Sequence, residues 1–118
     1  MNWLFLGALL AAAAVIAGAF GAHALAARLA PHELGLWETA ARYLMYGALS
    51  LMLLGLFARQ SMPRGGGRAG WCLLLGSLVF SGTVFALALG GPRWLGAVTP
   101  IGGVLLIVGF LLLAWAAR

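Results

Sequence analysis

The sequence predicts an all-α membrane protein, a bundle of four transmembrane helices with a short interfacial helix between helices 1 and 2. Of its 118 residues, 64% are hydrophobic and 8% are charged, and the mean hydropathy is +1.08. Soluble domains are about 25% charged. About 20 apolar residues in a helix cross the hydrocarbon core of a bilayer. Four stretches approach that length, at residues 3–22, 39–58, 71–90 and 95–117. With short connections they fill residues 1–118 as a single transmembrane domain.

The first span is rich in small residues that recur every fourth position. The pairs are Gly7/Ala11, Ala14/Gly18 and Gly18/Ala22. Such ridges let helix backbones approach closely, which matters because no hydrophobic force drives helices together in lipid. The ridge favours tight packing within the bundle over a homodimer seam.

The end of this span resembles a signal-peptidase site, because Ala22-His23-Ala24 has a small-x-small pattern after an apolar run. Residues 2–22 contain no Lys or Arg, so the charged region that opens a signal peptide is missing. The segment is therefore interpreted as the first helix.

The connection 23–38 carries much of the polar chemistry of the chain. Pro31 suits the first position of a helix, and Glu33 in the first turn complements the helix dipole. We expect a short interfacial helix here, which can run on into the second span, with Trp37 at headgroup level and a bend at Gly35. The other polar residues of the segment are His23, Arg28, His32 and Glu38.

The connection 59–69 reads RQSMPRGGGRA. Pro63 and the three consecutive glycines predict a non-helical loop. A phosphate-binding loop is the alternative interpretation, but it requires a following lysine and a preceding strand, and the sequence offers neither.

Charge counts set the expected orientation. Arg59, Arg64, Arg68 and Arg118 fall on the side of both termini, against Arg28, Arg42 and Arg93 on the other side. Cytoplasmic loops carry the excess of positive residues, so both termini are predicted to be cytoplasmic.

The fourth span contains Thr99-Pro100, the pattern of an N-cap residue followed by proline at the first helical position. We therefore expect the helix proper to begin near Pro100. Residues 91–98 would then form a tight turn with Trp94 at the interface.

A polar cluster of His23, Glu38, Arg42 and Tyr43 is the main candidate site. Ionisable residues at membrane depth are costly, and Glu38 lies four residues before Arg42, the favourable spacing for a helical ion pair. We hypothesise that His23, Glu38 and Arg42 meet near the non-cytoplasmic face and tie the first helix to the second. The alternatives are an interfacial salt bridge with Arg42 reaching the headgroups, or a contact with a substrate, a lipid phosphate or a partner protein.

The sequence offers little for catalysis or cofactors. The histidines and glutamates lack the spacing of a helical metal site, and Cys72 is the only cysteine. No Asp or Glu lies deep in a span, which argues against a proton-coupled transporter. We predict no catalytic residue, no metal and no cofactor.

Four motifs together resemble the domain-of-unknown-function 423 family, the YgdD/YwdK-like small inner-membrane proteins related to mitochondrial transmembrane protein 256. They are GAFGAHAL (18–25), WETAARYLMY (37–46), VFSGTVFALAL (79–89) and WLGAVTPIGG (94–103). The resemblance implies a bacterial inner-membrane protein of four helices and no established activity. This chain departs from the family pattern at Leu44, Gly47 and Phe85, where glutamine, histidine and tyrosine are typical.

For function, the small-residue ridges favour a non-catalytic accessory or scaffold protein that packs against other membrane proteins or itself. A small oligomeric permease or channel is the first alternative, and a lipid-modifying enzyme at the membrane interface is the second. The expected partners are membrane lipids and another membrane protein or a second copy, with no nucleic acid, because the arginines flank apolar segments instead of forming one basic face.

Overall fold

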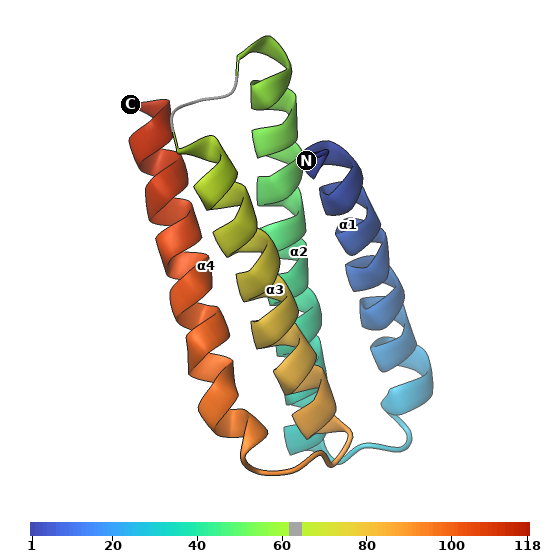
Figure 1. Cartoon of the computed structure of the whole chain (residues 1–118). Coiled ribbons are helices and arrows are strands. Elements are labelled where there is room, and N and C mark those ends of the chain that lie inside the picture. Colours follow the sequence, from blue (N-terminus) through green and yellow to red (C-terminus); the bar gives the residue numbers. More distant parts are fainter. Residues whose placement is uncertain (62–64) are drawn as a thin grey trace.

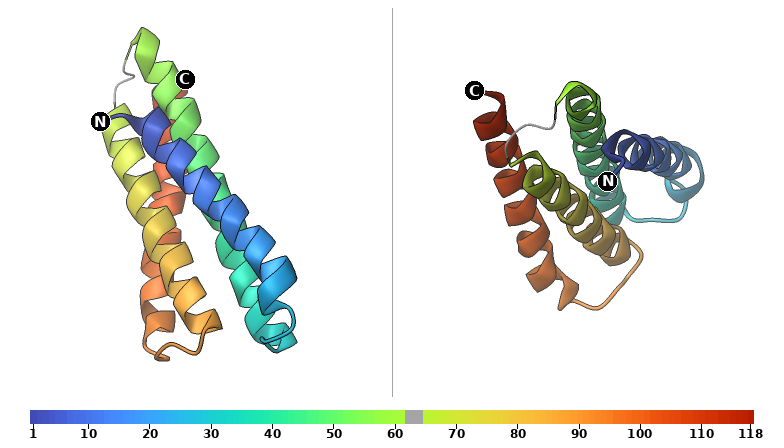
Figure 2. Two further views of the ribbon diagram at one scale, coloured as in Figure 1. Left: turned by 90° about the vertical axis from the view of Figure 1, so that its right-hand side faces the viewer. Right: turned by 45° about the horizontal axis from the view of Figure 1, so that its top comes forward.

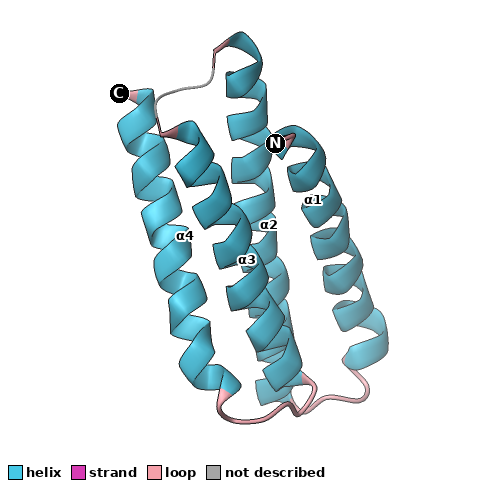
Figure 3. Cartoon of the chain, viewed as in Figure 1, coloured by secondary structure: helices cyan, strands magenta, loops and turns pink. Residues whose placement is uncertain are grey.

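The structure is a computed structural model that describes residues 1–61 and 65–118. Its helices are α1 (Trp3–Phe20), the π-helix η1 (Gly21–Leu25), α2 (Pro31–Gln60), α3 (Gly66–Ala88) and α4 (Leu95–Ala117). α1 runs into η1, and the resulting four helical segments are each long and apolar enough to cross a membrane. Successive helices run antiparallel, so both termini lie at one end with the α2–α3 connection (Figures 1 and 3). The predicted all-helical membrane bundle is confirmed.

The helices are arranged in chain order, and each one packs mainly on its neighbour in the sequence (Figures 1 and 2). α2 and α3 are central, while α1 and α4 lie at the outer edges. Within their most apolar stretches, 44% of α2 and 33% of α3 residues are buried, against 17% for each outer helix. The largest core side chains are Leu51, Leu54 and Leu73, which pack with Trp3 and Leu106.

The small residues of α1 contact α2 with a different spacing from the expected one. Gly7, Ala14 and Gly21 are buried, seven residues apart, whereas Gly18 is half-buried and Ala22 is exposed. Two turns of an α-helix take about seven residues, so this spacing keeps one face on the neighbouring helix. Tight packing within the bundle occurs on that face.

The second helix begins at Pro31, as expected for the interfacial segment, and continues without a break to Gln60. The interfacial helix is thus the first part of α2, and the bend expected at Gly35 is absent because this residue lies within regular helix. Pro31 occupies the first turn, where its missing N–H costs nothing.

Two other expected boundaries were wrong. α3 begins at Gly66, inside the glycine run predicted to be loop, because Gly65 takes the left-handed conformation at the N-cap (φ 81°) and the following glycine is buried. The loop prediction for residues 62–64 lies outside the described residues. α4 begins at Leu95, so Pro100 lies inside the helix instead of opening it.

Candidate functional site: a groove between α2 and α4

The residues of the predicted polar cluster lie on the surface of the bundle. His23 lies on the π-helix η1, and Glu38, Arg42 and Tyr43 lie on α2; all four are exposed. The Arg42 Nη2 group donates a hydrogen bond to Thr39 Oγ1 at 3.4 Å. Within residues 1–61 and 65–118, no hydrogen bond or ion pair joins His23, Glu38 and Arg42 to one another. The structure therefore does not bring the cluster into direct contact, and the roles assigned to these residues stay predictions.

Trp37 makes the polar contact between the first and second helices in this region. Its Nε1 donates a hydrogen bond to the Ala17 carbonyl at 2.7 Å. The ring covers Gly21 and packs edge-on against Phe85, with 4.5 Å between ring centroids. Trp37 is therefore half-buried between helices, and its expected position at headgroup level stays a prediction. Its helical spacing from the buried residues Ala40 and Leu44 is the sequence signal that identifies this inward face.

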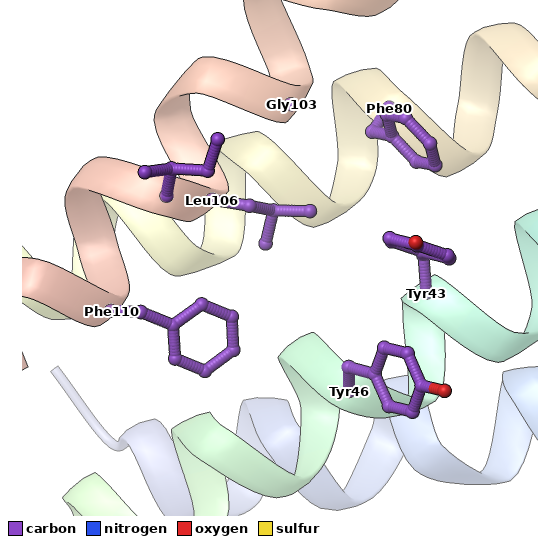
Figure 4. Close-up of a pocket in the computed structure, with 7 residues that line it drawn as sticks. Tyr43, Tyr46, Phe80, Gly103, Leu106 and Phe110 are labelled. Carbon is purple, nitrogen blue, oxygen red and sulfur yellow. The ribbon is translucent and has the colours of Figure 1, made fainter.

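A groove of about 310 Å³ lies between α2 and α4, and α3 forms its floor through Phe80. Tyr43 and Tyr46 form one wall, and the Tyr43 ring lies 4.9 Å from the ring of Phe80, between centroids. Figure 4 shows the side chains that line it, namely Tyr43, Tyr46, Phe80, Leu106, Ile107 and Phe110, with Gly103 beside them. Among the described residues, neither tyrosine hydroxyl has a hydrogen-bond partner. The groove is apolar apart from these two donors.

Polar residues follow the groove one turn nearer the start of α2, outside its own lining. Residues three or four apart share a helix face, so Thr39 and Arg42 lie next to Tyr43 and Tyr46 on α2. On the other helices Thr83 follows Phe80, and Thr99 precedes Gly103, at the same spacing. The two threonine hydroxyls share a hydrogen bond of 2.6 Å across α3 and α4. The apolar groove is thus followed by polar residues toward that end of the bundle.

Thr99 does not act as the expected N-cap. Its hydroxyl donates to the Leu95 carbonyl at 3.0 Å, inside α4, in addition to its contact with Thr83. A hydroxyl that bonds a carbonyl four residues back belongs to the helix interior. This explains why α4 begins before Thr99-Pro100.

The remaining buried hydroxyls are satisfied by helix carbonyls. Ser50 and Ser77 bond back within their own helices, and Ser81 Oγ donates to the Ala40 carbonyl of α2 at 2.8 Å. The Glu33 Oε2 atom, in the first turn of α2, is buried and has no hydrogen-bond partner among the described residues. In the part of the chain that the structure describes, no group of three or more His, Cys, Asp or Glu side chains could hold a metal ion.

The family model described as "Protein of unknown function (DUF423)" matches residues 17–103, which include α2, α3, most of the groove and Trp37. The chain belongs to the DUF423 family.

Bacterial members of similar length support the same assignment. A UPF0382 membrane protein of Staphylococcus epidermidis is 46% identical over 97% of this chain and 93% of its own length. UPF0382 membrane proteins of Staphylococcus saprophyticus and Staphylococcus aureus are 45% and 41% identical, over 92% and 90% of their lengths. No solved structure matches. The DUF423 chain described here is therefore a small membrane protein.

The three positions where this DUF423 member departs from the expected family pattern all serve packing. Leu44 is buried in α2 with 6% of its surface exposed. Gly47 faces Ser77 so closely that a side chain would not fit without movement, and Phe85 packs on Trp37. In this chain these sites stabilise the α2–α3 contact.

Proposed function

We propose that this protein is a non-catalytic accessory or scaffold protein of the bacterial inner membrane, which packs against another membrane protein or a second copy of itself. The observation that supports this proposal is a seam on the outer surface of the first helical segment, formed by α1 and η1. The seam consists of four alanines and one valine, all exposed, and their spacing alternates between four and three: Ala8, Ala12, Val15, Ala19 and Ala22. A 4-3 alternation places residues in one stripe along a helix.

This stripe differs from the face that α1 uses inside the bundle, where Gly7, Ala14 and Gly21 are buried. The bulky side chains of Phe5, Leu9 and Ile16 lie outside this stripe, and 53% or more of the surface of each is exposed. Lipid tails solvate bulky and small apolar side chains alike. A smooth stripe is useful for close approach of a second helix, where van der Waals packing stabilises association.

The position of α1 in the fold supports the same proposal. α1 forms one edge of the row of helices, and 17% of its apolar stretch is buried (Figures 1 and 2). An edge helix can receive a partner without any change in the bundle. The hydroxyls and the Trp37 indole that stabilise the interior already have partners, so they serve structure.

Bulk added to the seam tests the proposal. We expect the double substitution Ala12→Leu, Ala19→Leu to reduce recovery of the partner from native membranes by about tenfold, the effect of roughly 1.4 kcal/mol. Leucine keeps the surface apolar and favours helix, so the bundle itself should remain folded. The matched control is Ala13→Leu, because Ala13 is exposed but lies off the seam.

Crosslinking identifies the partner in the same membranes. In a Cys72→Ala background, Ala19→Cys should yield a disulfide-linked or maleimide-linked product, and Ala13→Cys should not. A product of twice the chain mass indicates a second copy, and any other product indicates a different membrane protein. Equal crosslinking at both positions, with unchanged recovery of the double leucine variant, would contradict the proposal.

A further inference from the structure

We propose that the groove between α2 and α4 binds one phospholipid with a primary ammonium headgroup, phosphatidylethanolamine, taken from the surrounding bilayer. An acyl chain occupies the apolar length of the groove, the phosphate lies at Arg42, and the ammonium group lies at Glu38. This inference does not depend on the partner-binding role proposed for α1.

The side chains along one face of α2 follow the same order as the parts of a phosphatidylethanolamine molecule. Tyr46, Arg42 and Glu38 are successive residues four apart, so they form a column toward the start of the helix. Along a phosphatidylethanolamine molecule the order is acyl chain, ester, phosphate and ammonium. The column presents the complementary order: an aromatic ring with a hydroxyl, a cation and then an anion.

Arg42 has hydrogen-bond donors that the described residues of the bundle do not use. A guanidinium carries five N–H donors, and the hydrogen bond from Arg42 to Thr39 is long, at 3.4 Å. Arg42 adjoins Tyr43, which stacks on Phe80, about two turns before α3 ends at Ala88. A cation within an apolar span is stabilised by an anionic partner. A phosphate fits because it accepts paired hydrogen bonds from arginine.

The volume of the groove suits an acyl chain better than a helix. An α-helix with its side chains is about 10–12 Å in diameter, so a groove of about 310 Å³ would hold only about 3–4 Å of its length. An acyl chain is much thinner and follows the wall formed by Phe80, Leu106 and Phe110 (Figure 4). Tyr43 and Tyr46 also line the groove, and each has a hydroxyl that can donate to an ester or phosphate oxygen. Lipid therefore fits the groove better than a helix of a second copy.

Glu38 selects the headgroup in this proposal. Its side chain is exposed, and in the described part of the chain it forms no ion pair with Arg42. A primary ammonium can donate hydrogen bonds to this carboxylate. The quaternary ammonium of phosphatidylcholine cannot donate, and phosphatidylglycerol has no cation. Glu38 therefore discriminates among headgroups, while Arg42 binds the phosphate common to all of them.

Native mass spectrometry of the full chain in detergent tests the site with dioleoyl lipids that differ only in headgroup. We expect one phosphatidylethanolamine per chain, bound about tenfold more strongly than phosphatidylcholine, since a charged hydrogen bond contributes about that factor. Arg42→Gln should weaken binding of both lipids by about tenfold. Glu38→Gln should abolish the preference between them while phosphatidylcholine binding is unchanged. Arg93→Gln is the control, because Arg93 is exposed at the same end of the bundle but precedes α4 and is not on the face of α2 that carries Arg42 and Glu38.

Filling the groove tests the acyl-chain position. A Cβ on Gly103 would lie 3.7 Å from the Phe80 ring, an ordinary contact distance, so Gly103→Leu should fold and occupy the groove. We expect it to reduce lipid binding at least tenfold, whereas Gly82→Leu, at an exposed glycine with open space around it, should bind like the parent. Binding without headgroup preference, or a preference that survives Glu38→Gln, would overturn the proposal. So would a dimer that excludes lipid and is lost in Gly103→Leu, because the occupant would then be a second copy.

Discussion

At the scale of single residues, Trp37 shows how a side chain expected at the membrane surface comes to hold helices together. Its ring fills the space that Gly21 leaves open, and its N–H reaches the Ala17 carbonyl at 2.7 Å. Phe20 and Phe85 lie on either side, with ring centroids 6.4 Å and 4.5 Å away. One residue thereby links α1, α2 and α3. An indole has both the apolar surface and the single donor that this position requires.

Substitution of Trp37 separates these two contributions. Trp37→Phe removes the N–H donor and should lower the free energy of unfolding by about 0.6–1 kcal/mol, the contribution of one such hydrogen bond. Trp37→Ala also removes the ring and should cost about 3 kcal/mol. Unfolding in mixed micelles, followed by circular dichroism, measures both values. If both variants unfold like the parent, the side chain contributes only a surface contact.

At the scale of elements, the crossing of α2 and α3 depends on the absence of a side chain at one position. A Cβ on Gly47 would lie 2.9 Å from Ser77 Cβ and closer still to Ser77 Oγ. Ser77 is fully buried, and its hydroxyl is held by the Leu73 carbonyl at 2.7 Å, so it cannot move away freely. Glycine at residue 47 therefore sets how closely the two central helices approach.

We expect Gly47→Ala to destabilise the bundle by about 1–3 kcal/mol, because overpacking forces the helices apart. Ser77→Gly removes the atoms that the new methyl group would meet. The double variant Gly47→Ala, Ser77→Gly should therefore be more stable than the sum of the two single effects predicts, a coupling measurable in a double-mutant cycle. Strict additivity of the two effects would show that this contact does not limit the crossing.

At the scale of the whole molecule, the two ends of the bundle differ in charge. The end that holds both termini carries Arg59, Arg68 and Arg118, whereas Arg28, Arg42 and Arg93 lie toward the opposite end. Arg64, between α2 and α3 in the sequence, brings the count to four against three. From this excess of positive residues we predict that both termini are cytoplasmic.

Cysteine accessibility tests this orientation in intact cells. In a Cys72→Ala background, a membrane-impermeant maleimide should label Ala30→Cys and leave Ser61→Cys unlabelled until the membrane is opened. Both parent residues are exposed at opposite ends of the bundle, so burial does not confuse the result. If only Ser61→Cys is labelled from outside, the orientation is the opposite of the one predicted.

The sequence by itself determined the class of the protein, the number of helices and their order, because these follow from runs of apolar residues that only a bilayer can solvate. It also placed the start of α2 at Pro31, since a proline suits the first helical turn. Local signals failed where tertiary contacts outweighed them. Thr99-Pro100 reads as a helix start, but α4 begins at Leu95, and the Thr99 hydroxyl bonds the Leu95 carbonyl and contacts Thr83 from inside the helix.

Only the tertiary structure decided which faces meet. The small residues of α1 occur at several helical spacings, and only contact with α2 shows that Gly7, Ala14 and Gly21 face inward while Ala8, Ala12 and their successors face outward. The groove joins side chains from three helices that are far apart in the chain, so no local pattern contains it. Arg42 is conspicuous in the sequence as a charge within an apolar span, but only the packing of α2 and α4 on α3 shows that a groove lies beside Tyr43 and Tyr46, the next turn along the helix. Hydropathy along the sequence shows that a segment is apolar enough for a membrane. Only the packed structure shows which residues contact one another.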